Sequence, residues 1–192
     1  RLCAFINANL PRHEDAAVSV FPGKEHRFVA RFTASGLSDA LSDADPQKEG
    51  RPPAGASAET AEAETSARLV NRFLEEVTRL LRTEPKANTA LLRGFSKFPS
   101  IPTIQELFKL RPAAIANYPM YKGLARLLGM DVLDVGGSPA ELFDALEKNF
   151  DKHDFFYIHY KRTDSAGEDG NFAAKVAAIE EVDAYIPRLF AL

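Results

Sequence analysis

The hydrophobic positions of the first half of the chain form two strand-like patterns followed by one helical pattern. The apolar run Leu2 to Leu10 and the alternating stretch His26 to Ala34 each predict a strand, with Phe21 to Lys24 as the turn between them. Seven apolar side chains then recur at helical spacing: Leu69, Val70, Phe73, Leu74, Val77, Leu80 and Leu81. This stripe predicts an amphipathic helix that packs one face on a core.

Short apolar runs and helical patterns alternate after Asn88. We expect strands at Thr89–Gly94, Ala113–Tyr118, Asp131–Val135 and Asp154–Tyr160, and helices at Met120–Gly129, Ser138–Phe150 and residues 172–186. Ser138 followed by Glu141 forms a capping box at the start of one helix. The alternation predicts an α/β chain, with α+β as the alternative, in which a mixed sheet is flanked by helices.

Two polar segments separate these patterns. Ser35 to Gly50 reads as an acidic loop, and Arg51 to Ser66 is rich in Ala, Glu and Pro, which makes it the segment expected to move most.

Composition narrows the classes of function. The chain has 192 residues and a net charge of −3, which favours neither nucleic acid nor an anionic membrane as partner. Its one cysteine, Cys3, excludes an internal disulfide and agrees with a reducing, cytoplasmic location. No apolar run is long enough for a transmembrane helix. Because the sequence starts at Arg1 without Met and stops in mid-pattern, we expect a piece of a longer protein.

The stretch after the last predicted strand carries two carboxylates, Asp164 and Glu168, on a Gly-containing turn. Oxygen ligands placed beyond a strand end suit Mg²⁺ or Mn²⁺. Acidic residues before a helix also serve as caps, and local chemistry alone favours this second reading.

Two further groups could bind a small anionic or hydroxylated molecule. Asp39, Asp43 and Asp45 lie in the acidic loop, where a solvated surface is the simpler explanation. Arg93 ends one predicted strand and Lys122 lies near the start of a helix, an arrangement suited to an anion, although isolated surface charges are the commoner case. The four histidines share no ligand spacing, and neither a phosphate-binding P-loop nor a serine elbow is present.

Several blocks together resemble a known family. "HRFVARF", "GLSDALSDADP", "NTALLRG", "YPMYKGLARLLGMDV" and "TDSAGEDGNF" occur in an order similar to that of archaeal-type cofactor-independent phosphoglycerate mutases, members of the alkaline phosphatase superfamily. The resemblance covers nearly the whole chain. It implies that residues 1–150 are an inserted phosphoglycerate-binding domain and that residues 151–192 are part of the metal-binding phosphatase core.

The resemblance also implies an activity, the interconversion of 3-phosphoglycerate and 2-phosphoglycerate through a phosphoserine. Asp164 and Glu168 would be ligands in a site for two divalent ions, Mn²⁺ or Mg²⁺, with no bisphosphoglycerate. The implied substrate-binding residues are Asp39, Asp43, Asp45, Arg93, Lys122 and Arg27. The family's nucleophilic serine and remaining metal ligands would lie outside the chain, so no catalytic residue is expected within it, and the chain alone should be inactive. An oligomer is left open.

Three positions depart from the family pattern: Leu107 replaces a lysine, Glu168 a histidine and Asn171 an aspartate. The alternatives are therefore a phosphate-ester hydrolase or other phosphotransferase of the superfamily, or a non-catalytic metabolite-binding relative. A strand taken alone from a parallel core would also leave two edges unpaired, so we expect residues 151–192 to pack poorly or to need a partner chain.

Overall fold

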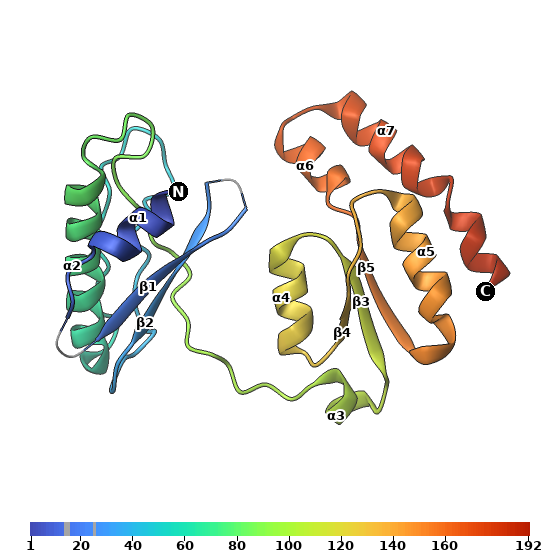
Figure 1. The fold of residues 1–192 in the computed structure, drawn as a ribbon, viewed down its shortest axis with the longest axis horizontal. Coiled ribbons are helices and arrows are strands. Elements are labelled where there is room, and N and C mark those ends of the chain that lie inside the picture. The colour runs from blue at the N-terminus through green and yellow to red at the C-terminus, as the bar shows by residue number, and fades with distance from the viewer. Residues whose placement is uncertain (14–15, 25) are drawn as a thin grey trace. The chain divides into compact units, whose positions relative to one another are not determined.

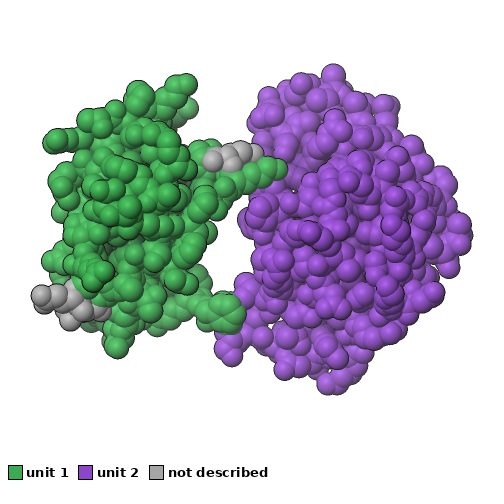
Figure 2. Space-filling view, in the orientation of Figure 1, with its two compact units in different colours: residues 1–99 green, residues 100–192 purple. Residues whose placement is uncertain are grey.

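The chain divides into two compact units, residues 1–99 (unit 1) and residues 100–192 (unit 2) (Figure 2). A computed structural model describes residues 1–13, 16–24 and 26–192. The boundary lies about fifty residues before the one expected at residue 150, because the strand after residue 150 is hydrogen-bonded into the sheet of unit 2. The assignment of residues 1–150 to a phosphoglycerate-binding domain and of residues 151–192 to the metal-binding phosphatase core stays a prediction.

Unit 1 packs two helices against a two-stranded antiparallel sheet (Figure 1). Its elements are α1 (Leu2–Asn9), β1 (Ala17–Pro22), β2 (Phe28–Thr33), the 3₁₀ helix η1 (Ala61–Ala63) and α2 (Glu64–Leu81). The predicted strand at β2 is confirmed. The predicted turn at Phe21 to Lys24 is only partly right, since Phe21 and Pro22 still pair with β2.

The strand predicted over Leu2 to Leu10 is wrong, because these residues form α1. Leu2, Ile6 and Leu10 recur every four residues, and this spacing brings all three to the core of unit 1. Ile6 is buried there, with Leu2 and Leu10 packed against the same cluster. The first strand of the unit is instead β1, which the sequence pattern did not indicate.

The predicted stripe on α2 is confirmed as the centre of unit 1. Val70, Phe73, Val77 and Leu81 are buried at intervals of three or four residues. The ring of Phe73, which has no exposed surface, meets Phe32 of β2 edge-on, with 5.4 Å between ring centroids. This contact joins the helix to the sheet.

Two asparagines, one on each helix of unit 1, hydrogen-bond to the backbone of a loop or of an edge strand. Asn71 accepts from the amide of Ala56 at 2.8 Å and donates to its carbonyl at 2.9 Å. Asn7 does the same to Val20 of β1, with both distances 2.8 Å. Each side chain thereby satisfies both backbone groups of one buried residue, as a neighbouring strand would. The segment around Ala56, expected to be mobile, is fastened to α2 in this way.

Unit 2 is built on a three-stranded parallel sheet with the order β4-β3-β5. Its elements are α3 (Ile104–Phe108), β3 (Pro112–Ala116), α4 (Pro119–Leu127), β4 (Asp131–Leu133), α5 (Pro139–Asn149), η2 (Phe150–Lys152), β5 (Phe155–His159), α6 (Arg162–Glu168), α7 (Phe172–Asp183) and η3 (Ile186–Ala191). The α/β class is confirmed, with the strands in two small sheets, one in each unit.

Alternating residues of β3 face two different cores. Ile115 packs with Leu142, Phe143 and Leu146 of α5, and α7 and η3 add further apolar side chains to this cluster. Ala114 faces the other way, towards α3, α4 and Met130. Helices therefore cover both faces of the sheet, and Figure 1 shows α4 and α5 on its opposite sides. The strands expected within residues 113–118, 131–135 and 154–160 are confirmed as β3, β4 and β5, but only β3 is buried along its whole length.

The expectation that the strand after residue 150 has two unpaired edges is wrong. Five residues of β5 pair with β3, from Pro112 opposite Phe155 to Ala116 opposite His159. At the start of this ladder the guanidinium of Arg111 donates to both carboxylate oxygens of Asp154, at 2.9 and 2.7 Å. Among the described residues, the outer edge of β5 has no partner strand.

The stretch Thr89 to Gly94 is not a strand either, although all its residues are described. Its contacts are scattered: the hydroxyl of Thr89 lies 2.7 Å from that of Thr78, and the carbonyl of Leu92 accepts from Ala44. These isolated bonds fix the segment without forming a ladder.

Candidate functional site

The carboxyl ends of β3 and β5 lie next to each other and carry a cluster of polar and aromatic side chains. The last pair of the ladder joins Ala116 to His159. The ring of His159 stacks on Tyr121 of α4, with 3.7 Å between centroids. Lys161 follows two residues later, and its ammonium lies 5.5 Å from the ring centre of Tyr118. Such an edge is where open α/β sheets place their ligands.

The two predicted metal ligands adjoin this cluster, but on a helix and not on a turn. Asp164 and Glu168 lie one helical turn apart on α6, so both side chains project from the same face. The ammonium of Lys161 donates to Asp164 Oδ2 and, at 3.3 Å, to Glu168 Oε2. The structure therefore brings the two carboxylates together around one cation.

Hydrogen bonding, burial and charge shift the pKa values of these groups in different directions. The hydrogen bond from Lys161 lowers the pKa of Asp164, and the same bond raises the pKa of Lys161. The pKa of His159 is lowered, first by burial and then by the nearby charge of Lys161. Among the residues that the structure describes, none forms a hydrogen bond with the buried ring nitrogen Nδ1 of His159. Burial and the neighbouring positive charge both favour the neutral form of the imidazole over the charged one.

The fit of this cluster to a divalent ion is partial. Two carboxylates converging on one point are suitable hard ligands for Mg²⁺ or Mn²⁺. Among the residues that the structure describes, however, no group of three or more His, Cys, Asp or Glu side chains could enclose a metal ion. Asp164 and Glu168 can therefore supply part of a coordination shell, with the rest coming from elsewhere.

The capping role suggested for this region belongs to Asn171. Its side chain accepts from the amide of Ala174 and so caps α7. Asp169, in contrast, is the C-terminal cap residue of α6 and directly follows Glu168. Asp164 and Glu168 cap neither helix.

Four of the predicted substrate-binding residues lie around one segment of unit 1. Asp39 accepts from the amide of Lys97 at 3.0 Å, and this bond is the largest cause of its lowered pKa. Asp43 accepts from the amide of Gly94 at 2.8 Å. Asp45 lies 3.8 Å from the guanidinium of Arg93. The acidic loop thus holds residues 93–97 in place.

The other two predicted substrate-binding residues lie apart in the chain. Lys122 is on α4 of unit 2 and donates to Asp134 at 2.9 Å, which lowers the pKa of that aspartate. Arg27 lies directly before β2, and its carbonyl accepts from the amide of Gly23 at 2.8 Å.

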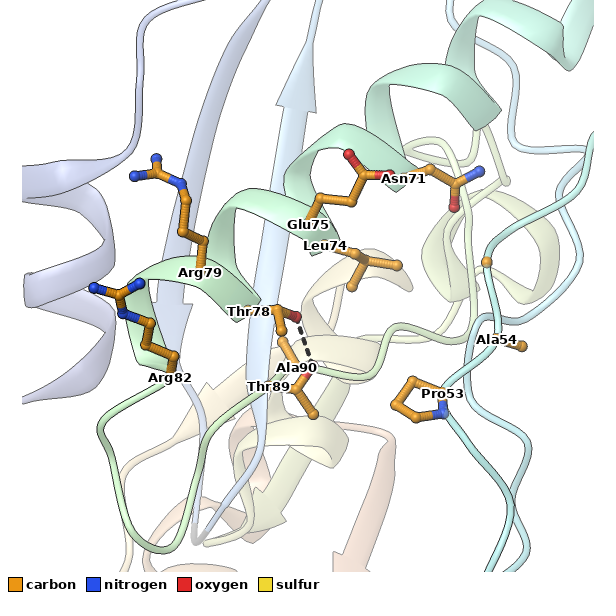
Figure 3. A pocket seen from close by; sticks show the side chains of 11 residues that line it. Pro53, Ala54, Asn71, Leu74, Glu75, Thr78, Arg79, Arg82, Thr89 and Ala90 are labelled. Carbon is orange, nitrogen blue, oxygen red and sulfur yellow. Dashed lines mark hydrogen bonds between the residues drawn. The ribbon is translucent and has the colours of Figure 1, made fainter.

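A separate hollow of about 660 Å³ lies on unit 1 between α2 and the segments at residues 53–55 and 89–90. None of the predicted site residues lines it. Figure 3 shows the guanidinium groups of Arg79 and Arg82 directed away from Pro53 and Ala54, so they do not converge on this space.

A parallel sheet covered by helices on both faces, with polar side chains beyond its carboxyl edge, defines an α/β domain of the kind that places ligand sites at that edge. Residues 26–192 match the Metalloenzyme superfamily, and the chain belongs to that superfamily.

Proteins similar to this chain carry a more particular name. The chain is 49% identical over its whole length to a probable 2,3-bisphosphoglycerate-independent phosphoglycerate mutase of Thermosipho africanus. It is 44% identical over its whole length to a protein of the same name from Thermotoga maritima. A third protein of this name, from Thermus thermophilus, is 49% identical over 195 residues. The chain spans about half the length of these relatives, 48% in each case.

Two solved structures share the fold of this chain. The cofactor-independent phosphoglycerate mutase of Thermoplasma acidophilum superposes with a TM-score of 0.64 at 28% identity, over 98% of this chain and 52% of that one. A protein from Pyrococcus horikoshii has the same fold, with a TM-score of 0.65 at 21% identity, over 95% of this chain and 46% of that one.

A membrane-crossing helix was not expected from the sequence. Within the described residues, every helix is too short or too polar to cross a bilayer.

Proposed function

We propose that this chain is about half of a metal-dependent phosphoglycerate mutase that interconverts 3-phosphoglycerate and 2-phosphoglycerate through a phosphoserine whose serine lies outside it. The observation that carries the proposal is the identity of 44–49% to proteins of that name across the whole chain. Asp164 and Glu168 lie on one face of α6, directly beyond β5, and this placement agrees with a metal-binding role for both.

In this proposal Asp164 and Glu168 supply two oxygen ligands to a site for two divalent ions, Mn²⁺ or Mg²⁺. When bound, such ions would stabilise the charge that develops on the transferring oxygens. Residues 151–192 would belong to the metal-binding core, which works in the cytoplasm without bisphosphoglycerate.

The proposed substrate residues have two kinds of role. Arg93, Lys122 and Arg27 would bind the carboxylate or phosphate of phosphoglycerate, because guanidinium and ammonium groups bind such anions strongly. Asp39, Asp43 and Asp45 would hold the hydroxyl groups of glycerate, or exchange protons with them. All but Lys122 fall in unit 1, and all six in the proposed substrate-binding domain, residues 1–150. No nucleic acid or membrane takes part.

The test compares the 192-residue chain with a longer protein that contains it and has the length of the relatives. Each is given 3-phosphoglycerate and Mn²⁺, with enolase to convert any 2-phosphoglycerate to a product that absorbs in the ultraviolet. We expect turnover from the longer protein and none from the 192-residue chain. Turnover by the short chain would contradict the location of the serine.

The same reactions distinguish the two alternatives. Release of inorganic phosphate without 2-phosphoglycerate would indicate the hydrolase of the superfamily. Binding of phosphoglycerate by the longer protein with neither product would indicate the non-catalytic relative.

A further inference from the structure

The outer edge of β5 is an open side of the parallel sheet. β5 pairs with β3 along its whole length, and among the described residues no strand pairs with its other edge. Every residue of β5 keeps some exposed surface, whereas every residue of the central strand β3 is buried. Parallel sheets are as a rule buried, because the N–H and C=O groups of an open edge attract further pairing. β5 therefore offers unpaired backbone groups to another strand.

The helix α7 is apolar on its exposed side as well as towards the core. Its residue Val182 packs into the cluster that α5 forms with β3, while Phe172 and Ile179 are 81% and 50% exposed. These two residues lie seven positions apart, so they share one face of the helix. Only Ala178 of α7 is fully buried. A helix that is apolar around most of its circumference is typical of a buried element, so α7 has the surface of a helix with a second neighbour.

The connections of the sheet indicate the side on which a further strand belongs. The crossover from β3 to β4 passes through α4 on one face, and the crossover from β4 to β5 passes through α5 on the other. Direction and face reverse together, so both crossovers have the same hand, as nearly all such connections do. Val182 and Tyr185 place α7 on the face of α5. A further crossover of the same hand through α7 leads to the outer edge of β5, and not to that of β4.

We infer that the outer edge of β5 and the exposed side of α7 form one docking surface. Its occupant is a parallel strand, with apolar side chains that cover Phe172 and Ile179, from the part of the longer protein outside this chain. The inference rests on the proposed function for the existence of that longer protein, since the chain spans 48% of the relatives it matches. A parallel strand satisfies the open groups of β5 with the same kind of ladder that already joins β5 to β3.

The experiment measures amide hydrogen exchange of residues 155–159 by NMR, in the 192-residue chain and in the longer protein that contains it. Amides of β5 that face away from β3 exchange quickly at an open edge and slowly once a strand pairs with them. We expect their exchange to be at least about tenfold slower in the longer protein, relative to the β5 amides already bonded to β3. No slowing of the outward set relative to this internal reference overturns the inference.

A pair of matched phenylalanines tests the part of the surface on α7. Phe108 of α3 is 65% exposed, and α3 packs through Ile104 on the opposite face of the sheet. In the longer protein F172A should lower the calorimetric unfolding midpoint by at least about 4 °C, because it empties a covered position. F108A should shift it by less than about 1 °C, as should either change in the 192-residue chain, where both side chains are exposed. Equal shifts for F172A and F108A in the longer protein contradict the docking surface.

A second copy of this chain is the competing occupant. It is indicated if the 192-residue chain forms dimers that protect the outward amides of β5 while the longer protein leaves them unprotected, and this result overturns the inference. The proposed function fails separately. A longer protein without mutase activity that protects these amides refutes only the function, and an active mutase with an open β5 edge refutes only the docking surface.

Discussion

Replacing Ile115 by alanine should destabilise unit 2 selectively. The side chain has no exposed surface and lies at the centre of β3, against Leu142, Phe143 and Leu146 of α5. An Ile-to-Ala change in a core costs about 2–5 kcal/mol, depending on how far the neighbours can relax. Because β3 is the central strand and is paired on both sides, it cannot move inwards easily. We therefore expect a loss above the lower end of that range, about 3–4 kcal/mol.

The distribution of aromatic residues supplies a probe for this change. The chain has five tyrosines and no tryptophan, and every tyrosine falls in unit 2: Tyr118, Tyr121, Tyr157, Tyr160 and Tyr185. Tyrosine fluorescence during urea unfolding thus reports on unit 2. With a urea dependence of about 1.5 kcal/mol per molar, the midpoint for I115A should fall by about 2 M.

Two control variants sharpen the reading. I115V removes one methyl group and should cost only about 0.5–1.5 kcal/mol. F73A empties part of the core of unit 1, so it should lower the helical circular dichroism transition while leaving the tyrosine transition in place. If I115A lost no more unfolding free energy than I115V, the tight packing of Ile115 against α5 would be refuted. A tyrosine transition shifted equally by F73A would refute separate cores.

Two further predictions concern unit 2. In R111M the pKa of Asp154, which the Arg111 hydrogen bonds lower from 3.8 to about 2, should rise towards 3.8 in a carboxyl NMR titration. A lowered folded-state pKa contributes stability above about pH 3.8 that is lost as the pH falls towards 2. Acid unfolding of R111M should therefore depend less on pH in this window. An unchanged pKa of Asp154 in R111M would contradict the hydrogen bonds from Arg111 to Asp154. S138A removes the acceptor for the Glu141 amide at the start of α5 and should cost about 1 kcal/mol in the tyrosine-detected unfolding, whereas S138T should recover most of it; equal stability of all three proteins would rule out the cap.

Elements with their own local signals were predictable from the sequence. The helix α5 begins at the Ser138–Glu141 capping box, and both of its reciprocal hydrogen bonds form. The strands β3 and β5 are short apolar runs bounded by polar residues, as the pattern indicated. In these cases the residues that specify the element are adjacent in the chain, so sequence alone suffices.

The errors occur where tertiary contacts decide the conformation. The apolar run at Leu2 fits either a strand or a helix, and burial of Ile6 against the core of unit 1 selects the helix. Residues 89–94 resemble a strand but find no ladder partner in the described part of the chain. A short apolar run carries no information about whether a neighbouring edge is free to receive it.

The candidate site was half visible in the sequence. Asp164 and Glu168 stand out because two carboxylates follow a strand. Lys161 was missed, although its spacing of three from Asp164 on a helix would have placed the two side chains together. The contact with Tyr118 could not be found this way, because it depends on β3 and β5 being neighbours in the sheet.

The paired hydrogen bonds of Asn7 and Asn71 make unit 1 sensitive to chemical ageing. Each amide both donates to and accepts from the backbone of one buried residue, Val20 or Ala56. Spontaneous hydrolysis of either amide would leave a carboxylate, which accepts but cannot donate. An oxygen would then face the carbonyl that the amide had bonded, and a buried acceptor would lose its donor. The stability of unit 1 would thereby fall during long storage, although the amino-acid sequence encoded by the gene is unchanged.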